Sequence, residues 1–214
     1  MTGVLQTRRS CRGYLPDEVP KALIESIVRA AQWAPSWSNV QPWQVDVVSG
    51  EVRDRLTANF ADESIERGPD VAFPRGYTGI YRDRRRTSGW QLYDALGITR
   101  GDRAASAAEA SRNFEFFGAP HAAIVSTERA LGEYGILDCG LFIQAFLTAA
   151  EAAGLGTIAQ ASVASRSPTL HEQLSIPSSR AVLCAIAFGY PDPSHPSARV
   201  RTERAPLDEV VRFH

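Results

Sequence analysis

The hydrophobic and polar positions along this chain change period several times, and each change predicts a new element. Residues 17–34 carry apolar side chains at steps of three and four, which predicts a helix with one face toward a core, ended by Pro35. Residues 43–48 alternate between apolar and polar side chains, as a half-buried strand does. Residues 51–61 return to four-residue steps and predict a second helix.

The second half of the chain is more apolar. Residues 133–153 are apolar almost all round, which predicts a central, buried helix that stops at Gly154. The continuous apolar run 181–188 predicts a central strand that is buried on both faces. Other patterns predict a helix at 104–117, strands at 122–125 and 157–161, and a helix with Ser167 as N-cap and Pro168 as its first residue.

These elements predict an α+β fold in which helices flank a mixed, mainly antiparallel sheet of four to five strands. At 214 residues, of which 44% are hydrophobic, the chain has the size and composition of a single domain spanning residues 1–214. The polar region 62–102, rich in arginine and glycine, offers only a modest helical pattern at 89–96. The tail PLDEVVRF carries apolar residues that a chain end does not normally expose, so we expect it to dock on another surface.

Charge and apolar content argue against several classes of protein. The formal net charge of −1 gives no general attraction to nucleic acid or to anionic membranes. Residues 1–14 lack the apolar segment of a secretory signal, and the longest apolar stretch, 139–150, is short for a membrane span and contains Gln144. We therefore expect a cytoplasmic protein with neither a nucleic-acid nor a membrane partner.

The residue types that most often do chemistry are scattered. The three cysteines form no CxxC pair and have no histidine at ligand spacing, so we expect buried or incidental thiols, with no disulfide framework and no metal site. The four histidines accompany no HExxH and no recognisable nucleophile motif, which gives a catalytic triad little support. A bound cofactor is then the better candidate for the reactive group.

Two basic segments are candidates for binding an anion. In TRRSCR, Arg8, Arg9 and Arg12 with Ser10 offer the guanidinium forks and the hydroxyl that hold a phosphate or a carboxylate. The alternatives are a solvated basic N-terminus and, with less support, a nucleic-acid contact. In DRRR, residues 83–86, a solvated loop or helix face is favoured over a clamp for an anionic substrate or a nicotinamide phosphate.

Two loops combine stiff backbone with unusual side chains. In APSWSNVQPW, residues 34–43, prolines restrict the backbone; Trp37, between polar residues, is predicted to wall a pocket for a planar partner, and Trp43, in the strand pattern, to lie in the core. GLGTIA, residues 154–159, matches G-x-G-x-x-A, but a helix precedes it and a strand follows, the reverse of the dinucleotide-binding order. We interpret its glycines as a helix stop and a close backbone approach.

Five segments, in this order along the chain, resemble one family: RRSCRGYLPDEVP, APSWSNVQPWQVDVVSG, RNFEFFGAP, GLGTIAQASV and RTERAPLDEVV. Together they resemble the FMN-dependent nitroreductase family, and most of all its nitrobenzoate reductase-like members. The likeness extends over nearly the whole chain. It implies a nitroreductase-like fold completed in a homodimer, two FMN sites at the subunit interface, a variable lid at roughly 63–100, and a tail at roughly 205–214 that wraps the partner subunit.

The resemblance implies that arginines near both chain ends bind FMN. The residues that would hold its ribityl chain and phosphate are Arg8, Arg9 and Ser10 at the N-terminus, with Arg204 and Arg201 near the C-terminus. Arg12 would lie near the pyrimidine edge of the flavin, where a cation stabilises the reduced ring. Thr202 stands where the family often has lysine, a departure that could loosen phosphate binding.

The resemblance also implies which groups surround the flavin ring. Backbone groups around Gln160, Ala161 and Ser162 would face its N5 region after a turn at Gly156, and Asn113 or its neighbour Arg112 would reach the pyrimidine edge. The residues that would wall the ring from the other subunit are Pro35, Ser36, Trp37, Asn39 and Gln41. The family commonly has glycine or serine where Trp37 stands, so this pocket could be narrower.

The implied activity is that of an FMN-dependent oxidoreductase. It would take a hydride from NADPH or NADH and pass electrons to a nitroaromatic or similar electron-poor small molecule in a ping-pong reaction, with no catalytic side chain. Family relatives with dehydrogenase, dehalogenase or flavin-fragmenting activity would share the same cofactor site, so these activities are alternatives. Two further alternatives are a non-catalytic flavin-binding protein and a basic-loop interaction protein without a cofactor.

Overall fold

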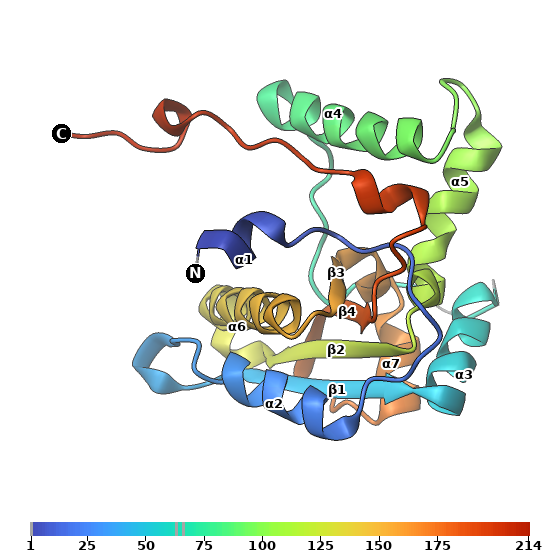
Figure 1. Cartoon of the computed structure of the whole chain (residues 1–214). Coiled ribbons are helices and arrows are strands. Elements are labelled where there is room, and N and C mark those ends of the chain that lie inside the picture. Colours follow the sequence, from blue (N-terminus) through green and yellow to red (C-terminus); the bar gives the residue numbers. More distant parts are fainter. Residues whose placement is uncertain (1, 63, 66) are drawn as a thin grey trace.

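The computed structural model, which describes residues 2–62, 64–65 and 67–214, is built on one four-stranded sheet (Figure 1). Its strands lie in the order β1-β2-β4-β3, and every pairing among them is antiparallel. The prediction of an α+β fold with four to five strands is confirmed, with four. β2 and β3 run in the same direction, but β4 lies between them and pairs antiparallel with both. The bounds are β1 (Trp43–Ser49), β2 (His121–Glu128), β3 (Gly156–Gln160) and β4 (Arg180–Gly189).

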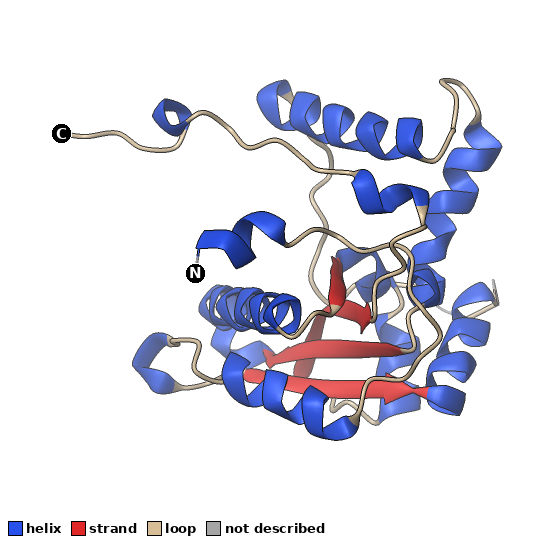
Figure 2. Cartoon of the chain, in the orientation of Figure 1, coloured by secondary structure: helices blue, strands red, loops and turns tan. Residues whose placement is uncertain are grey.

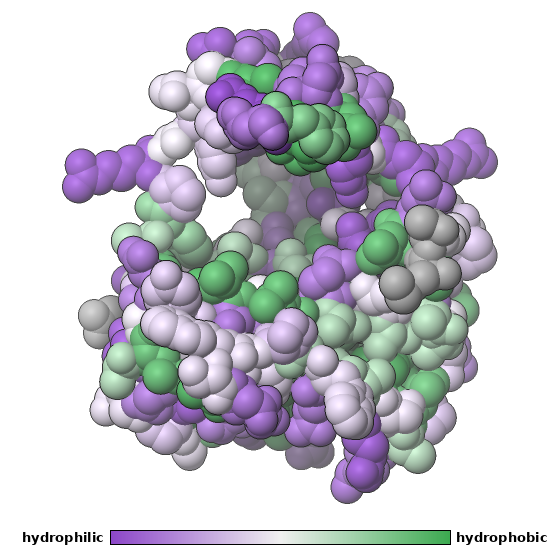
Figure 3. All heavy atoms as spheres, turned by 90° about the vertical axis from the view of Figure 1, so that its left-hand side faces the viewer, coloured by the Kyte–Doolittle hydropathy of each residue, from purple (hydrophilic) through white to green (hydrophobic). Residues whose placement is uncertain are grey.

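Helices cover both faces of the sheet (Figure 2). α2 (Lys21–Ala31) and α6 (Gly132–Ala152) pack together on one face, and α3 (Gly50–Ala61) packs with α7 (Ser167–Leu174) on the other. Three helices lie outside these layers: α1 (Thr2–Thr7), α4 (Gly79–Ala95) and α5 (Arg103–Ser111). In Figure 3 a hollow separates the upper part of the molecule, which holds α4, from the lower part, which holds the sheet.

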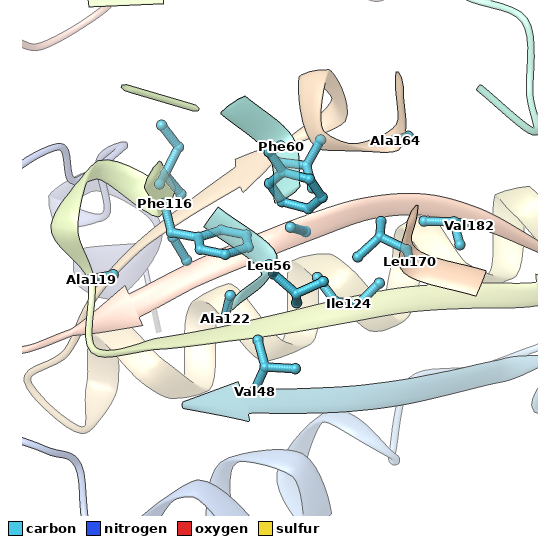
Figure 4. Packing of buried hydrophobic residues seen from close by; sticks show 14 of the residues in the cluster. Val48, Leu56, Phe60, Phe116, Ala119, Ala122, Ile124, Ala164, Leu170 and Val182 are labelled. Carbon is cyan, nitrogen blue, oxygen red and sulfur yellow. The ribbon is translucent and has the colours of Figure 1, made fainter. Parts of the chain in front are cut away.

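The core on the α3 and α7 side is shown in Figure 4. Phe60 from α3 meets Phe116 edge-on with ring centroids 5.9 Å apart, and both rings are fully buried. Burying one such large side chain stabilises the fold by about 1.5–3 kcal/mol. β4 supplies side chains to both cores, since Val182 and Ala185 face this cluster while Ile186 faces the α2 and α6 side. The prediction of a central strand buried on both faces is confirmed.

α6 is the most apolar helix, but one face of it is not covered by its own chain. Together with the turn before it, the segment Arg129–Ala152 is long and apolar enough to cross a membrane by length and composition, which differs from the expectation that no stretch was long enough. Within the fold Phe142 and Phe146 are fully buried against the sheet. On the outer side Tyr134 and Leu137 are 57% and 58% exposed, so the expectation that the whole helix is buried was wrong for this face.

Element boundaries differ from expectation where local geometry overrides the hydrophobic period. α4 is longer than the predicted 89–96 because it buries no residue and so has no apolar period to read. α5 ends at Ser111 and a 3₁₀ segment, Arg112–Gly118, follows. The predicted helix cannot reach residue 117, because Phe116 and Phe117 have φ of +51° and +55°. Ser167 is the first residue of α7 rather than its N-cap, and its Oγ donates to the Ala164 carbonyl at 2.7 Å.

Candidate functional site

The N-terminal strip, residues 8–12, lies along the outer strand β3. Ser10 forms a parallel bridge with Thr157, and the Cys11 N–H donates to the Thr157 carbonyl at 2.9 Å. A Cβ added to Gly156 would lie 2.7 Å from the Cys11 Sγ, closer than side chains ever approach. The interpretation of the glycine segment is confirmed: Gly154, with φ of +79°, stops α6, and Gly156 permits the close approach of the strip.

This strip forms one wall of a cavity of about 410 Å³. The second wall comes from the C-terminal segment 200–204, and the third from Ser88 and Leu92 of α4. The chain therefore brings together side chains separated by nearly its full length. The residues expected from the sequence to hold a phosphate-bearing cofactor all line this cavity: Arg8, Arg9, Ser10, Arg12, Arg201 and Arg204.

The arginines of the cavity are not neutralised by direct ion pairs. In the part of the chain that the structure describes, no carboxylate forms an ion pair with Arg8, Arg9, Arg12, Arg201 or Arg204. Guanidinium forks hold phosphate through two hydrogen bonds at once, and each charge-assisted bond contributes about 1.5–3 kcal/mol. The donor set therefore fits a phosphate-bearing ligand, and FMN carries one phosphate.

Arg12 is half-buried. Burial lowers the pKa of its guanidinium, and the charge of Glu109 is the largest effect that opposes this. Arg112 is bound to the protein through both terminal nitrogens: Nη2 donates to the Arg12 carbonyl at 2.9 Å and Nη1 pairs with Glu109 Oε2 at 3.2 Å. Arg112 thus supports the Arg12 backbone and is not directed at the cavity.

Asn113 and Gln160 form a pair at the end of β3. The Gln160 Nε2 donates to the Asn113 carbonyl at 2.8 Å and to its Oδ1 at 3.3 Å, while the Asn113 Nδ2 donates to the Ala110 carbonyl at 3.0 Å. Gln160 is 2% exposed, and its Oε1 has no hydrogen-bond partner among the described residues. Ala161 follows it and is exposed. A buried amide oxygen without a donor is costly, so this end of β3 suits a ligand that carries N–H groups.

The loop 34–41 lies elsewhere and does not line this cavity. Trp37 is 62% exposed and packs on Tyr134 of α6 with ring centroids 4.5 Å apart. Its backbone N–H donates to both carboxylate oxygens of Asp138, at 3.2 and 3.1 Å. Of the loop residues expected to wall a flavin, those that are exposed are Pro35, Trp37, Asn39 and Gln41. Ser36 is half-buried, and its Oγ accepts a hydrogen bond from the Gln41 N–H at 3.0 Å.

Asp138 is a residue that sequence reasoning missed. It is 4% exposed and lies within the apolar run of α6. The sequence did contain a signal for it, namely a single carboxylate in an otherwise apolar stretch of helix. A carboxylate is buried only where it has hydrogen-bond or charge partners, so its position indicates a specific contact.

The remaining candidates have structural roles. Cys11, Cys139 and Cys184 are free and buried, as predicted, and burial raises the pKa of the Cys184 thiol to about 12. Trp43 stacks on Phe142 at 5.1 Å, which confirms its place in the core. The DRRR segment is an exposed face of α4, as favoured. Asp83 pairs with Arg82 at 3.2 Å, and Arg84 Nη2 pairs with Glu209 Oε2 at 2.6 Å. No group of three or more His, Cys, Asp or Glu side chains suited to a metal ion occurs within the described residues.

Comparison with known proteins agrees with this geometry. Residues 5–190 match the model of the Nitroreductase family. The chain belongs to this family. The nitroreductase-family relatives include a 4-nitrobenzoate reductase from Nocardioides sp. (strain LMS-CY), which is 35% identical over 98% of this chain and 88% of the relative. The Nitroreductase NfnB of Mycolicibacterium smegmatis (strain ATCC 700084 / mc(2)155) is 34% identical over 98% of this chain and 91% of the relative.

The fold of this nitroreductase-family chain is also that of a solved relative. The crystal structure of the FMN-dependent nitroreductase NfnB from Mycobacterium smegmatis, in complex with NADPH, matches it with a TM-score of 0.92 at 33% identity. The match covers 100% of this chain and 97% of that one. The family resemblance and the nitroreductase-like fold expected from the sequence are therefore confirmed.

Proposed function

We propose that this protein is an FMN-dependent oxidoreductase that uses NADPH or NADH to reduce nitroaromatic or similar electron-poor small molecules. The observation that carries the proposal is the arginine-lined cavity, in which residues from both chain ends meet around space for a phosphate-bearing cofactor. The family and its FMN- and NADPH-dependent relatives support the identity of the cofactor. When bound, FMN accepts a hydride and passes electrons on, so that the protein needs no nucleophile of its own.

Different side chains of the cavity would bind different parts of FMN. Arg8, Arg9 and Ser10 on one wall, with Arg201 and Arg204 on the other, would hold the phosphate and ribityl chain. Arg12 would place a preorganised positive charge at the pyrimidine edge. Gly156 keeps the strip against β3, so that these groups are positioned by the sheet and not by a loose terminus.

We assign the second contact at the pyrimidine edge to Asn113 rather than Arg112. The guanidinium of Arg112 is bound to Glu109 and to the Arg12 carbonyl, whereas the Asn113 Nδ2 donates only to the Ala110 carbonyl within the described residues and has a second N–H for a ligand. Gln160 and the exposed backbone at Ala161 would then face the N5 region of the ring.

We further propose that the site is completed in a homodimer. The loop with Trp37 does not reach the cavity of its own chain, so a second copy would have to supply it. The exposed apolar face of α6, with Tyr134 and Leu137, supports a contact between copies. The tail supports it too, since Phe213 is 91% exposed and Figure 1 shows the tail extending away from the rest of the chain.

Residues 63–100 are proposed to act as the lid of this single domain, 1–214. α4 buries no side chain in its own chain, yet its Ser88 and Leu92 line the cavity. A weakly packed helix over a cofactor site can admit different substrates without disturbing the sheet. The expected cytoplasmic location and the absence of nucleic-acid and membrane partners stay predictions.

The visible spectrum of the purified protein tests the proposal. We expect flavin absorbance, its loss on anaerobic addition of NADPH or NADH, and its return when a nitroaromatic is added. Replacing Arg8 and Arg204 together with alanine should abolish FMN binding, whereas Arg86→Ala, on the exposed face of α4, should not. A protein that stays colourless with added FMN contradicts cofactor binding. A bound flavin that neither nucleotide bleaches identifies a binding protein without turnover.

A further inference from the structure

A buried carboxylate lies behind the arginine cavity. The side chain of Glu109, on α5, is 9% exposed and pairs with Arg112 through Oε2 at 3.2 Å. Its second oxygen, Oε1, is buried and has no hydrogen-bond partner within the described residues. A single hydrogen-bonded arginine does not satisfy an ionised carboxylate, so its remaining charge acts on the groups around it.

The ion pair of Glu109 and Arg112 lies next to Arg12. Both arginines lie over the ring of Phe117, with the Arg12 and Arg112 guanidinium carbons 5.7 and 5.3 Å from its centroid. Arg112 also donates to the Arg12 carbonyl at 2.9 Å and to the Phe117 carbonyl at 3.4 Å. Arg112 therefore links Glu109 to the Arg12 backbone, and the side chains of Arg12 and Arg112 both lie over the Phe117 ring.

Other titratable groups around Arg12 add little charge at neutral pH. Burial raises the pKa of both Tyr14 and Cys11, which stay protonated. His195, whose Nε2 is 3.5 Å from Arg112 Nη1, has its pKa lowered by burial and by the charge of Arg112, so its ring is neutral. Glu109 is thus the negative charge that faces the two arginines in the described part of the chain.

We propose that Glu109 is a positioning residue that sets how much positive charge Arg12 presents to the flavin, and thereby keeps the FMN midpoint potential low. The inference rests on the proposed function, in which Arg12 lies at the pyrimidine edge. Reduction adds negative charge at that edge, so a cation there favours the reduced form and raises the potential. Glu109 opposes this effect, because its negative charge lies beside Arg112, which contacts Arg12, and offsets part of the positive potential at that edge. A lower potential makes the reduced cofactor a stronger electron donor.

The test is the midpoint potential of bound FMN, measured by equilibration with a reference dye. Glu109→Gln keeps an acceptor for Arg112 but removes the charge, and we expect a shift to more positive potential with FMN still bound. Glu115→Gln, on the exposed side of the turn after α5, should cause no shift. In an Arg12→Gln background the shift caused by Glu109→Gln should be smaller, because part of the effect passes through Arg12.

The outcomes separate this inference from the proposed function and from a merely structural role. An unchanged or more negative potential in FMN-loaded Glu109→Gln contradicts the inference. If that variant does not fold, Glu109→Asp is measured instead, because its side chain is one methylene shorter and moves the carboxylate away from Arg112. A midpoint potential identical to that of the unaltered protein would then contradict the inference equally. Failure of the unaltered protein to bind FMN would contradict the proposed function itself.

Discussion

The carboxylate of Asp138 accepts the backbone N–H of Trp37 through both of its oxygens, at 3.2 and 3.1 Å. This contact joins the exposed aromatic loop to the buried helix α6, where Asp138 is 4% exposed. The loop after Trp37 needs such an anchor, because Ser38, Asn39 and Gln41 all have φ near +50° or above, a conformation that non-glycine residues adopt at a cost. Asp138 therefore determines where Trp37 stands.

Replacing Asp138 with alanine should weaken FMN binding. The Trp37 N–H would lose its partner, at a cost of about 1–3 kcal/mol, and the loop would no longer hold one conformation. We expect roughly a tenfold rise in the FMN dissociation constant, as 1.4 kcal/mol corresponds to a factor of ten. Fluorescence titration measures it, with Asp138→Asn, which retains one acceptor oxygen, as the milder variant. Unchanged affinity in Asp138→Ala would remove this role.

Asp70 ties the segment before α4 to the rest of the fold. Its carboxylate accepts hydrogen bonds from the Val182 N–H at 2.7 Å, from His171 Nε2 at 2.8 Å and from Arg129 Nη2 at 2.5 Å. The other ring nitrogen of His171 lies 2.9 Å from the Ile176 carbonyl, so the ring is fixed between Asp70 and the backbone. Asp70→Asn should therefore lower the free energy of unfolding by about 3 kcal/mol.

The pH dependence of stability gives a second measure of this contact. Burial alone would raise the pKa of Asp70, but the hydrogen bonds from Val182, His171 and Arg129 outweigh it and hold the pKa below its ordinary value. The stabilisation is then present above the unfolded pKa, about 3.9, and is lost as the pH falls through the lower folded value. Urea unfolding between pH 7 and pH 3 should show a shallower decline for Asp70→Asn. Asp208→Asn, in the exposed tail, is the control.

Periodicity predicted the elements that pack on the sheet, because burial on one or two faces leaves a repeat in the sequence. β4 and α3 were predicted to within two residues for this reason. Most of α4 was not predicted, because none of its residues is buried and no apolar repeat marks it in the sequence. Among the site residues, Arg8 and Arg204 could be proposed from their basic segments and the family resemblance. No role could be proposed for Asp138 or Glu109, because a lone acidic residue in a helix carries no periodic signal. The partner of Asp138 is Trp37, about a hundred residues away, and the partner of Glu109, Arg112, itself contacts the distant Arg12.

Gly156 should tolerate no side chain. Its φ is ordinary for any residue, so the effect of Gly156→Ala is purely steric: the new Cβ would lie 2.7 Å from the Cys11 Sγ and 3.1 Å from the Pro191 Cβ. Relieving such overlap costs about 1–3 kcal/mol and would push the arginine strip away from β3. We expect a lower melting temperature and weaker FMN binding. Gly76→Ala, in an exposed loop where the added Cβ would meet nothing within 4 Å, should leave both unchanged or raise stability slightly.

The exposed tail offers the sharpest test of the proposed dimer. Leu207, Val210 and Phe213 are 71%, 69% and 91% exposed in the single chain, an arrangement that favours burial against a second copy. Truncation after Ala205 should yield monomers or insoluble protein, as measured by sedimentation. In the full-length chain, replacing these three residues with serine should do the same while leaving the backbone of the tail in place.

Glu209→Gln is the matched control for these tail variants. It removes the charge that pairs with Arg84 of α4 at 2.6 Å but leaves the apolar residues of the tail intact. An exposed ion pair contributes about 0–1 kcal/mol, so this variant should still form dimers. A truncated chain that sediments as a stable dimer with bound FMN would show that the subunits associate through α6 and its neighbours alone. The apolar side chains of the tail would then need another surface to cover them, since water disfavours their exposure in either state.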